Sequence, residues 1–260
     1  MYRCAGGVPH GPVDLAGALE KSCNGYFIEL GRRLGPAAVR QMAAALGFGQ
    51  GQRVAGSLQS ASGALPEAGT LENQGQFANF CFGQGELMAT PLQVAAMMNT
   101  IAAGGVYRRP LFADCVVDET TGEELAPLAH WEARRAMSAS TAATLRELLA
   151  GVVARGTGQQ AAPAQGTGAG KTGTAQTGQF RQGQELKNYW FAGFYPAEKP
   201  RWTIVVLQDP RQSPGYPAPP SLPGCAMGWL PGLRGETLRF WLDFWSRLCY
   251  YILVFVCLLS

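Results

Sequence analysis

A lysine-centred motif, K-T-G-T at residues 171–174, has the side chains needed to bind a carboxylate beside a reacting carbonyl. The segment begins a predicted strand, in which Lys171 and Gly173 point to one face and the two threonines to the other. A lysine ammonium holds a substrate carboxylate, a neighbouring hydroxyl binds the same group, and a glycine lets an acyl chain lie against the backbone. Taken alone, however, the motif is more typical of a solvated lysine at the start of a strand.

The glycines that precede Lys171 do not form a phosphate-binding loop. That loop has the pattern G-x-x-x-x-G-K-[ST], which requires glycine at position 165. The chain has Gln165 there, and the nearest glycine, Gly166, is one residue too close. The preceding segment is also not a hydrophobic strand, so nucleotide binding is not predicted.

A second polar motif, S-C-N at residues 22–24, lies between two predicted helices. Where the chain is extended, residues i and i+2 face the same way, so Ser22 and Asn24 can both enter a cleft while Cys23 packs behind them. A hydroxyl can relay a proton, and an amide can bind a peptide carbonyl and orient a lysine. Taken alone, serine and asparagine at helix ends are usually caps.

The composition excludes several classes of function. A net charge of +3 over 260 residues gives no basic stripe, which disfavours nucleic-acid binding, and 47% hydrophobic residues exclude a disordered chain. The seven cysteines form no C-x-x-C pair, and His10 and His130 are the only histidines. This spacing predicts no metal site and no cofactor, and each cysteine is expected to be a small buried hydrophobic residue.

Hydrophobic periodicity predicts helices in the first two-thirds of the chain and strands after residue 156. Short helices are expected at 12–20 and 36–47, and between them a helix with Phe27, Leu30 and Leu34 on one face. An almost wholly apolar helix is expected over 90–104. The last expected helix is amphipathic, with one apolar stripe formed by Leu145, Leu148, Leu149, Val152 and Val153. Residues 47–86 are interpreted as a long surface excursion, and a hairpin is expected around 118–122. Expected strands at 171–174, 189–194 and 202–207 have short connections, which favours an antiparallel meander.

The two ends of the sequence carry weaker signals. The N-terminal MYRCAGGVPHG has no pattern of an export signal. The apolar run from Leu248 to Leu259 is too short to span a bilayer alone, and no membrane anchor is predicted. Because the composition changes after Pro214, residues 215–260 are interpreted as an aberrant apolar tail that arises from a changed reading frame.

Together, the two motifs resemble the second and third signatures of the penicillin-recognising serine acyltransferases, S-x-N and K-T-G, whose first signature is S-x-x-K. Their separation, 171 minus 22 or 149 residues, is similar to that in the transpeptidase domains of penicillin-binding proteins. The resemblance extends over residues 1–214 through HGPVDLAGALEKSCNGYFIELGRRLG, FGQGELMATPLQVAAMMNTIAAGG, GTG before GKTGTAQ, and NYWFAGFYPAEKP. The GQGE-x-x-x-TPLQ pattern is most similar to the monofunctional, class B-like members.

The resemblance implies an α+β fold with a helical subdomain and an antiparallel sheet. It also implies a serine acyl-enzyme formed with the D-Ala-D-Ala end of a peptidoglycan stem peptide, or with a β-lactam that mimics it. The implied roles are proton relay for Ser22, acyl-chain binding for Asn24, an electropositive clamp for Lys171 and Thr172, a spacer for Gly173, and an oxyanion N–H with a carboxylate-binding hydroxyl for Thr174.

The family also implies partners and a location. Its full-length members work with a membrane glycosyltransferase and the elongation or division machinery, at the extracytoplasmic face of the bacterial plasma membrane.

One departure from the family pattern concerns the nucleophile. No S-x-x-K or T-x-x-K occurs in the 260 residues, because the residues three places before Lys21, Lys171, Lys187 and Lys199 are Ala18, Gly168, Gln184 and Pro196. The sequence therefore predicts a partial transpeptidase domain, without its N-terminal strands and nucleophile helix, that is inactive alone. The alternative is a non-catalytic fragment or pseudoenzyme that acts as an interaction module. A D,D-carboxypeptidase or β-lactamase relative is disfavoured by the GQGE-x-x-x-TPLQ pattern.

Overall fold

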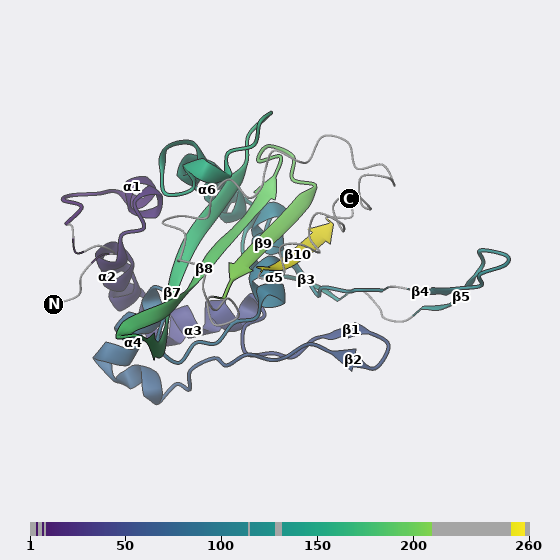
Figure 1. Cartoon of the computed structure of the whole chain (residues 1–260), viewed down its shortest axis with the longest axis horizontal. Coiled ribbons are helices and arrows are strands. Elements are labelled where there is room, and N and C mark those ends of the chain that lie inside the picture. The colour runs from purple at the N-terminus through teal and green to yellow at the C-terminus, as the bar shows by residue number, and fades with distance from the viewer. Residues whose placement is uncertain are drawn as a thin grey trace. The chain divides into compact units, whose positions relative to one another are not determined.

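The computed structural model describes residues 4, 7, 9–113, 115–127, 132–209 and 251–257 (Figure 1). The chain divides into two compact units. The first unit comprises Met1–Tyr2 and Asn24–Leu145, and the second comprises Arg3–Cys23 and Arg146–Ser260. Most of the expected tail, residues 215–250 and 258–260, lies outside the described residues.

The first unit is mainly helical, with three short antiparallel strand pairs. Its helices are α2 (Asn24–Leu34), α3 (Pro36–Ala45), the 3-10 turn η2 (Thr70–Glu72), α4 (Gln74–Cys81), α5 (Pro91–Ala102) and the first residues of α6 (Ala139–Arg155). The strand pairs are β1 (Arg53–Ala55) with β2 (Leu58–Gln59), β3 (Val106–Arg108) with β6 (Ala133–Arg135), and β4 (Cys115–Val117) with β5 (Glu124–Pro127). The last pair is the hairpin predicted around 118–122.

Helix α5 is the buried centre of the first unit, as its uniformly apolar sequence predicts. A capping box starts it, in which Thr90 and Gln93 satisfy each other's backbone N–H groups. The buried Gln93 side chain also reaches out of the helix, and its Nε2 donates to the carbonyls of Gly47, Gln50 and Ser62 at 3.2, 3.3 and 2.7 Å. One amide therefore holds the 47–63 loop against α5.

The interpretation of residues 47–86 as a long surface excursion is wrong in part. The segment contains β1, β2, η2 and α4. Asn73 begins α4, since its Oδ1 accepts from the N–H groups of Gly75 and Gln76. Phe77 and Phe80 of this helix are buried in a cluster with Leu71. These few large apolar residues stabilise the helix, although its Gln- and Gly-rich sequence shows little periodicity.

The second unit is built on a four-stranded antiparallel sheet. Its strands are β7 (Ala169–Arg181), β8 (Gln184–Tyr195), β9 (Trp202–Gln208) and β10 (Tyr251–Cys257), in the order β10-β9-β8-β7. The predicted meander is therefore confirmed, and with it the α+β fold class. The residues between the expected strands 171–174 and 189–194 also belong to the sheet, because they extend β7 and β8 into a long hairpin.

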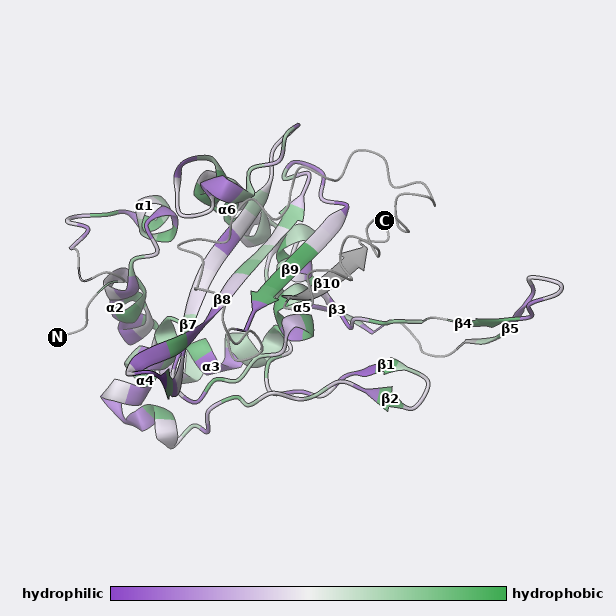
Figure 2. Ribbon diagram, viewed as in Figure 1, coloured by the Kyte–Doolittle hydropathy of each residue, from purple (hydrophilic) through white to green (hydrophobic). Residues whose placement is uncertain are grey.

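Strand β9 forms the apolar core of this sheet. Six of its seven residues are buried, and Val205 is wholly so. Figure 2 shows the middle of this strand as strongly hydrophobic. The apolar sequence 251–257 pairs with β9 as strand β10, rather than forming a helix. Within the described ranges, no helix has both the length and the apolar character needed to cross a bilayer.

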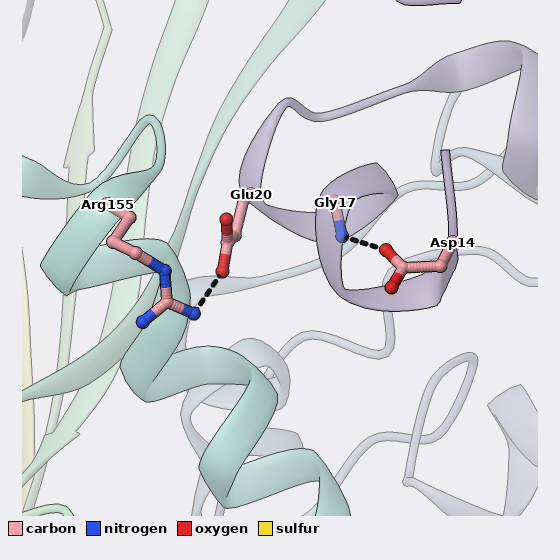
Figure 3. Close-up of polar contacts among 4 residues, drawn as sticks. All are labelled: Asp14, Gly17, Glu20 and Arg155. Carbon is pink, nitrogen blue, oxygen red and sulfur yellow. Dashed lines mark hydrogen bonds and ion pairs between the residues drawn. The ribbon is translucent and has the colours of Figure 1, made fainter. Parts of the chain in front are cut away.

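Two helical segments of the second unit lead to the site described below. Helix α1 (Leu15–Glu20) is capped by Asp14, whose Oδ1 accepts from Gly17 N at 2.8 Å (Figure 3). Helix α6 ends at Arg155 and carries the buried residues Leu149, Val152 and Val153 of the predicted amphipathic stripe. It is followed by a short 3-10 turn, η3 (Gln159–Ala161).

Candidate active site

The K-T-G-T motif lies near the start of β7, the outer strand of the described sheet. The strand begins buried at Ala169 and Gly170 and becomes exposed at Gly173 and Thr174. Its register pairs Lys171 with Ala192 of the neighbouring strand β8. The motif is thus positioned by a sheet with a buried centre, while its last two residues face solvent.

Two glycines of this strand have different physical reasons to be glycine. A Cβ on Gly170 would lie 2.6 Å from the Phe191 ring and 2.8 Å from the Ala192 carbonyl oxygen, so sheet packing requires a glycine there. A Cβ on Gly173 would meet only Trp190 Cβ at 3.5 Å, an ordinary contact. Packing within the described residues therefore does not require glycine at 173, and its expected role as a spacer stays a prediction.

Ser22 lies in the turn that ends α1. Its backbone is left-handed, with φ of 54°, a conformation that is uncommon for a residue with a side chain. The turn is held by Ser22 N donating to Leu19 O at 3.2 Å and by Cys23 N donating to Ala18 O at 2.8 Å. Cys23 is buried, as predicted, and Ser22 is half-buried. The folded turn thus fixes the direction of the Ser22 hydroxyl.

The Lys171 ammonium connects the two motifs. Its Nζ donates to Ser22 Oγ at 3.1 Å, to the Thr172 carbonyl oxygen at 2.8 Å and to Thr157 Oγ1 at 3.5 Å. All three acceptors are neutral oxygens, and none of the ion pairs between described residues includes Lys171. The site therefore presents a hydrogen-bonded cation whose charge is not compensated by a neighbouring carboxylate.

Burial lowers the pKa of Lys171 from its usual 10.5 to about 8. The side chain still carries its charge at neutral pH, since that pKa lies above 7. An anion bound beside the ammonium would favour the charged form and offset the loss of solvation. The electrostatics of the site thus favour a negatively charged ligand.

Thr157 also belongs to this site, although no motif in the sequence assigned it a role. Its Oγ1 is 2.8 Å from Thr172 Oγ1, and its hydroxyl also accepts from Lys171 Nζ. The side chains of Lys171 and Thr172 therefore both contact Thr157, although neighbouring residues of a strand were expected to face opposite ways. The signal for it in the sequence is the G-T-G segment at 156–158, which forms part of the family resemblance.

Backbone contacts with the end of α1 position Thr157. Its N–H donates to the Glu20 carbonyl oxygen at 2.9 Å. A Cβ on the preceding Gly156 would lie 2.6 Å from the same oxygen, so only glycine allows this close approach. The Glu20 carboxylate pairs with Arg155 at 2.5 Å (Figure 3). The end of α6 is thus tied to the helix whose terminal turn carries Ser22.

The structure brings together three of the six predicted site residues, Ser22, Lys171 and Thr172. Gly173 and Thr174 follow on the same strand and are exposed. Asn24 is the first residue of α2 and belongs to the first unit, so its expected part in acyl-chain binding stays a prediction. The group is suited to holding an anion at Lys171 and to passing a proton through the Ser22 hydroxyl.

Comparison with known proteins identifies the family of the chain. Residues 5–220 match the family model described as the penicillin binding protein transpeptidase domain. The chain is 37% identical over 226 residues to Penicillin-binding protein PbpB of Mycolicibacterium smegmatis, and the alignment covers 80% of this chain and 34% of that protein. It is 34% identical over 214 residues to Peptidoglycan D,D-transpeptidase PbpA of Mycobacterium tuberculosis, with 78% and 41% covered.

Solved structures confirm the fold. Penicillin-binding protein A from M. tuberculosis, in its imipenem acyl-enzyme complex, superposes with a TM-score of 0.67 at 31% identity, and covers 78% of this chain and 44% of that one. The chain thus spans less than half the length of these relatives.

Proposed function

Because the chain belongs to the penicillin-binding protein transpeptidase domain family, we propose that it provides the carboxylate-binding and proton-relay part of a peptidoglycan D,D-transpeptidase site. The hydrogen bond from Lys171 to Ser22 carries this proposal, because it joins the two motifs across 149 residues of sequence and leaves the lysine charge uncompensated. The substrate class is a peptide that ends in D-Ala-D-Ala.

The terminal carboxylate of that peptide is the anion that Lys171 holds. Thr174, exposed three residues along β7, adds a hydroxyl to the same carboxylate. Two donors on one strand fix the position of the last peptide bond relative to the nucleophile. Gly173, whose neighbours leave room, lets the acyl chain lie along the strand.

Ser22 relays the proton in this proposal. A serine nucleophile attacks the penultimate D-Ala carbonyl, the peptide C–N bond breaks, and the departing amine of the last D-Ala needs a proton. Ser22 Oγ accepts a hydrogen bond from the Lys171 ammonium, so its own hydroxyl hydrogen is directed elsewhere and is available to that amine. The lysine of the S-x-x-K segment takes the proton of the nucleophile, and Ser22 receives that proton as it gives its own to the amine, so Lys171 keeps the charge that holds the carboxylate. A second stem-peptide amine then attacks the acyl-enzyme and completes the cross-link.

The nucleophile of this reaction is not among the 260 residues, since no serine or threonine precedes a lysine by three places. We propose that an S-x-x-K segment outside these residues supplies it, and that the chain alone does not become acylated. β-Lactams belong to the proposed ligand class because they carry a carboxylate and mimic D-Ala-D-Ala. The proposal also includes the extracytoplasmic location and the glycosyltransferase and elongation or division partners of the family.

A second candidate is an interaction module that binds such peptides without reacting. The missing S-x-x-K favours it, because the described site can hold a carboxylate but the sequence provides no activated oxygen for covalent chemistry. In this reading residues 1–214 fold as a partial domain, and residues 251–257 of the tail add strand β10 to its sheet.

Fluorescent penicillin labelling separates the two candidates. We expect no covalent label on the 260-residue chain between pH 6 and 9, and stoichiometric label when an in-frame S-x-x-K segment of a relative precedes it. Lys171→Ala in the extended chain removes most of the label, whereas Lys187→Ala, an exposed lysine on β8, retains it. Failure of the extended chain to label while it folds normally would favour the interaction module. Covalent label on the 260-residue chain alone would show that these residues contain a competent nucleophile, and would overturn the proposal.

A further inference from the structure

Three residues of the second unit that the proposed reaction does not use lie together beside the Ser22 turn. Cys4, His10 and Cys23 each offer one ligand atom, and these atoms all lie within 4.8 Å of one another. Cys23 is buried, and the other two residues are half-buried. From these contacts we propose that the three residues bind a single zinc ion, which braces the turn that carries Ser22.

The distance between the two sulfur atoms fits a shared metal. Cys4 Sγ and Cys23 Sγ are 3.7 Å apart. Zinc holds thiolates at about 2.3 Å in a tetrahedral arrangement, which places two sulfur ligands about 3.8 Å from each other. A disulfide bond requires sulfurs separated by about 2.0 Å. The observed spacing therefore matches two ligands of one ion better than a covalent pair.

The histidine supplies a second, independent observation. His10 Nδ1 is buried and has no hydrogen-bond partner in the described part of the chain. A buried polar atom without a partner is unfavourable, and such atoms are rare in native structures. An imidazole nitrogen beside two thiolates is a common zinc ligand, and a bound ion would give His10 Nδ1 the partner that it lacks. A simple cysteine pair would not explain the placement of this ring.

The donor set selects the metal. Two sulfur ligands and one imidazole suit borderline-soft Zn²⁺ and disfavour Mg²⁺ and Ca²⁺, which take oxygen ligands. Three protein ligands leave a fourth tetrahedral position, which a water molecule or a donor outside the described residues fills. No local pattern in the sequence indicates this site, because its ligands are six and thirteen positions apart and helix α1 lies between His10 and Cys23.

The position of Cys23 gives the ion a structural consequence. Cys23 directly follows Ser22, whose backbone is in the uncommon left-handed conformation. An ion on Cys23 would tie this turn to residues 4 and 10 of the N-terminal segment. It would therefore stabilise the strained turn and hold the Ser22 hydroxyl in the position where it accepts from Lys171. The proposal concerns metal binding alone, so it stands or falls independently of the transpeptidase reaction.

Metal analysis of the purified full chain, kept reduced, tests the proposal. We expect one zinc per chain by inductively coupled plasma mass spectrometry, and a Co²⁺-substituted protein with thiolate-to-metal charge-transfer and intense tetrahedral d–d absorption. Cys4→Ser and His10→Gln should each lose the ion and the charge-transfer spectrum, or bind it at least tenfold more weakly. The matched controls Cys115→Ser and His130→Gln should retain both.

Thermal denaturation provides a second readout. A chelator should lower the Tm of the unaltered chain but not that of Cys4→Ser, and far-ultraviolet circular dichroism of Cys4→Ser should show a folded protein. Cys4 is the preferred site for this variant because Cys23 is buried in the turn and its replacement can disturb folding. Zinc retained equally by Cys4→Ser and the controls would overturn the proposal. So would a reduced wild-type chain that binds no zinc, or native protein in which intact mass and peptide mapping find a Cys4–Cys23 disulfide.

Discussion

Gln93 in the first unit and Lys171 in the second each place one nitrogen near three oxygen atoms, yet the two arrangements differ in charge. The neutral amide of Gln93 meets the carbonyls of three loop residues, so its polar requirements are met by the fold. The Lys171 ammonium also meets three neutral oxygens, but it carries a positive charge that no described ion pair balances. The first arrangement stabilises the fold, and the second is suited to an anionic ligand.

Replacing each residue by an apolar one tests this difference most strongly. Gln93→Leu removes the donor to the carbonyl of the buried Gly47 and to those of the exposed Gln50 and Ser62, and should lower the free energy of unfolding by about 3 kcal/mol. Lys171→Met removes a desolvated charge and should leave the free energy of unfolding unchanged or higher at pH 7. Urea denaturation of both variants at pH 7 measures the contrast. Equal destabilisation by the two substitutions would show that Lys171 is mainly structural.

The two glycines of β7 extend the comparison to packing. Gly170→Ala should lower the free energy of unfolding by about 2 kcal/mol, because its methyl group would overlap the Phe191 ring and a carbonyl oxygen. Gly173→Ala should change it by less than about 0.5 kcal/mol. The same denaturation measurement applies, and in an extended, nucleophile-bearing chain Gly173→Ala should still reduce penicillin labelling. Strong destabilisation by Gly173→Ala would remove the argument that this glycine serves a ligand.

The lowered pKa of Lys171 predicts a pH dependence of stability. The folded-state pKa is about 8 and the usual value is 10.5, so the unfolded chain binds more protons between these values. The unfavourable contribution of the buried charge is fully present below pH 8, and stability should rise as the pH increases from 8 toward 10.5. The difference in unfolding free energy between the unaltered chain and Lys171→Met, measured across this range, isolates the effect. A difference that does not vary with pH would contradict the burial of the charge.

The smallest effect is expected at the ion pair between Glu20 and Arg155. Arg155 is mostly exposed, with 67% of its side chain accessible, so solvent screens the interaction. Arg155→Gln should lower the free energy of unfolding by about 0.5 kcal/mol or less, and high salt should reduce the difference further. Thermal melts at low and high salt measure it. The Glu20 carbonyl, which binds Thr157 through the backbone, is unaffected by this change.

Local patterns were sufficient to predict much of the fold. The apolar run and Thr90-Pro91 start predicted α5, and three short apolar strands with short connections predicted the meander. Helix α4 was missed because it depends on an Asn73 cap and a few aromatic contacts rather than on a regular stripe. Tertiary packing overrides weak helix propensity in such segments.

The candidate site was predicted where short motifs carry it and missed where distant segments meet. Ser22 and Lys171 belong to recognisable motifs, and the structure places them in contact. Thr157 depends on a backbone contact with Glu20, more than a hundred residues away in sequence. Cys4, His10 and Cys23 follow no local ligand pattern, so spacing alone led to the expectation of no metal site. Contacts of this kind depend on how the chain folds back on itself.

Titration of Lys171 with and without ligand tests the central claim most directly. In the 260-residue chain, the pKa of the Lys171 side chain can be followed by nuclear magnetic resonance of its Nζ and Cε atoms, with Lys171→Met to assign the signals. We predict a pKa of about 8 in the unliganded chain, and an increase when a peptide ending in D-Ala-D-Ala is added, because the bound carboxylate favours the charged ammonium. The same peptide with its C-terminus amidated should produce no increase. An ordinary lysine pKa that neither peptide changes would contradict the assignment of Lys171 as the carboxylate-binding residue.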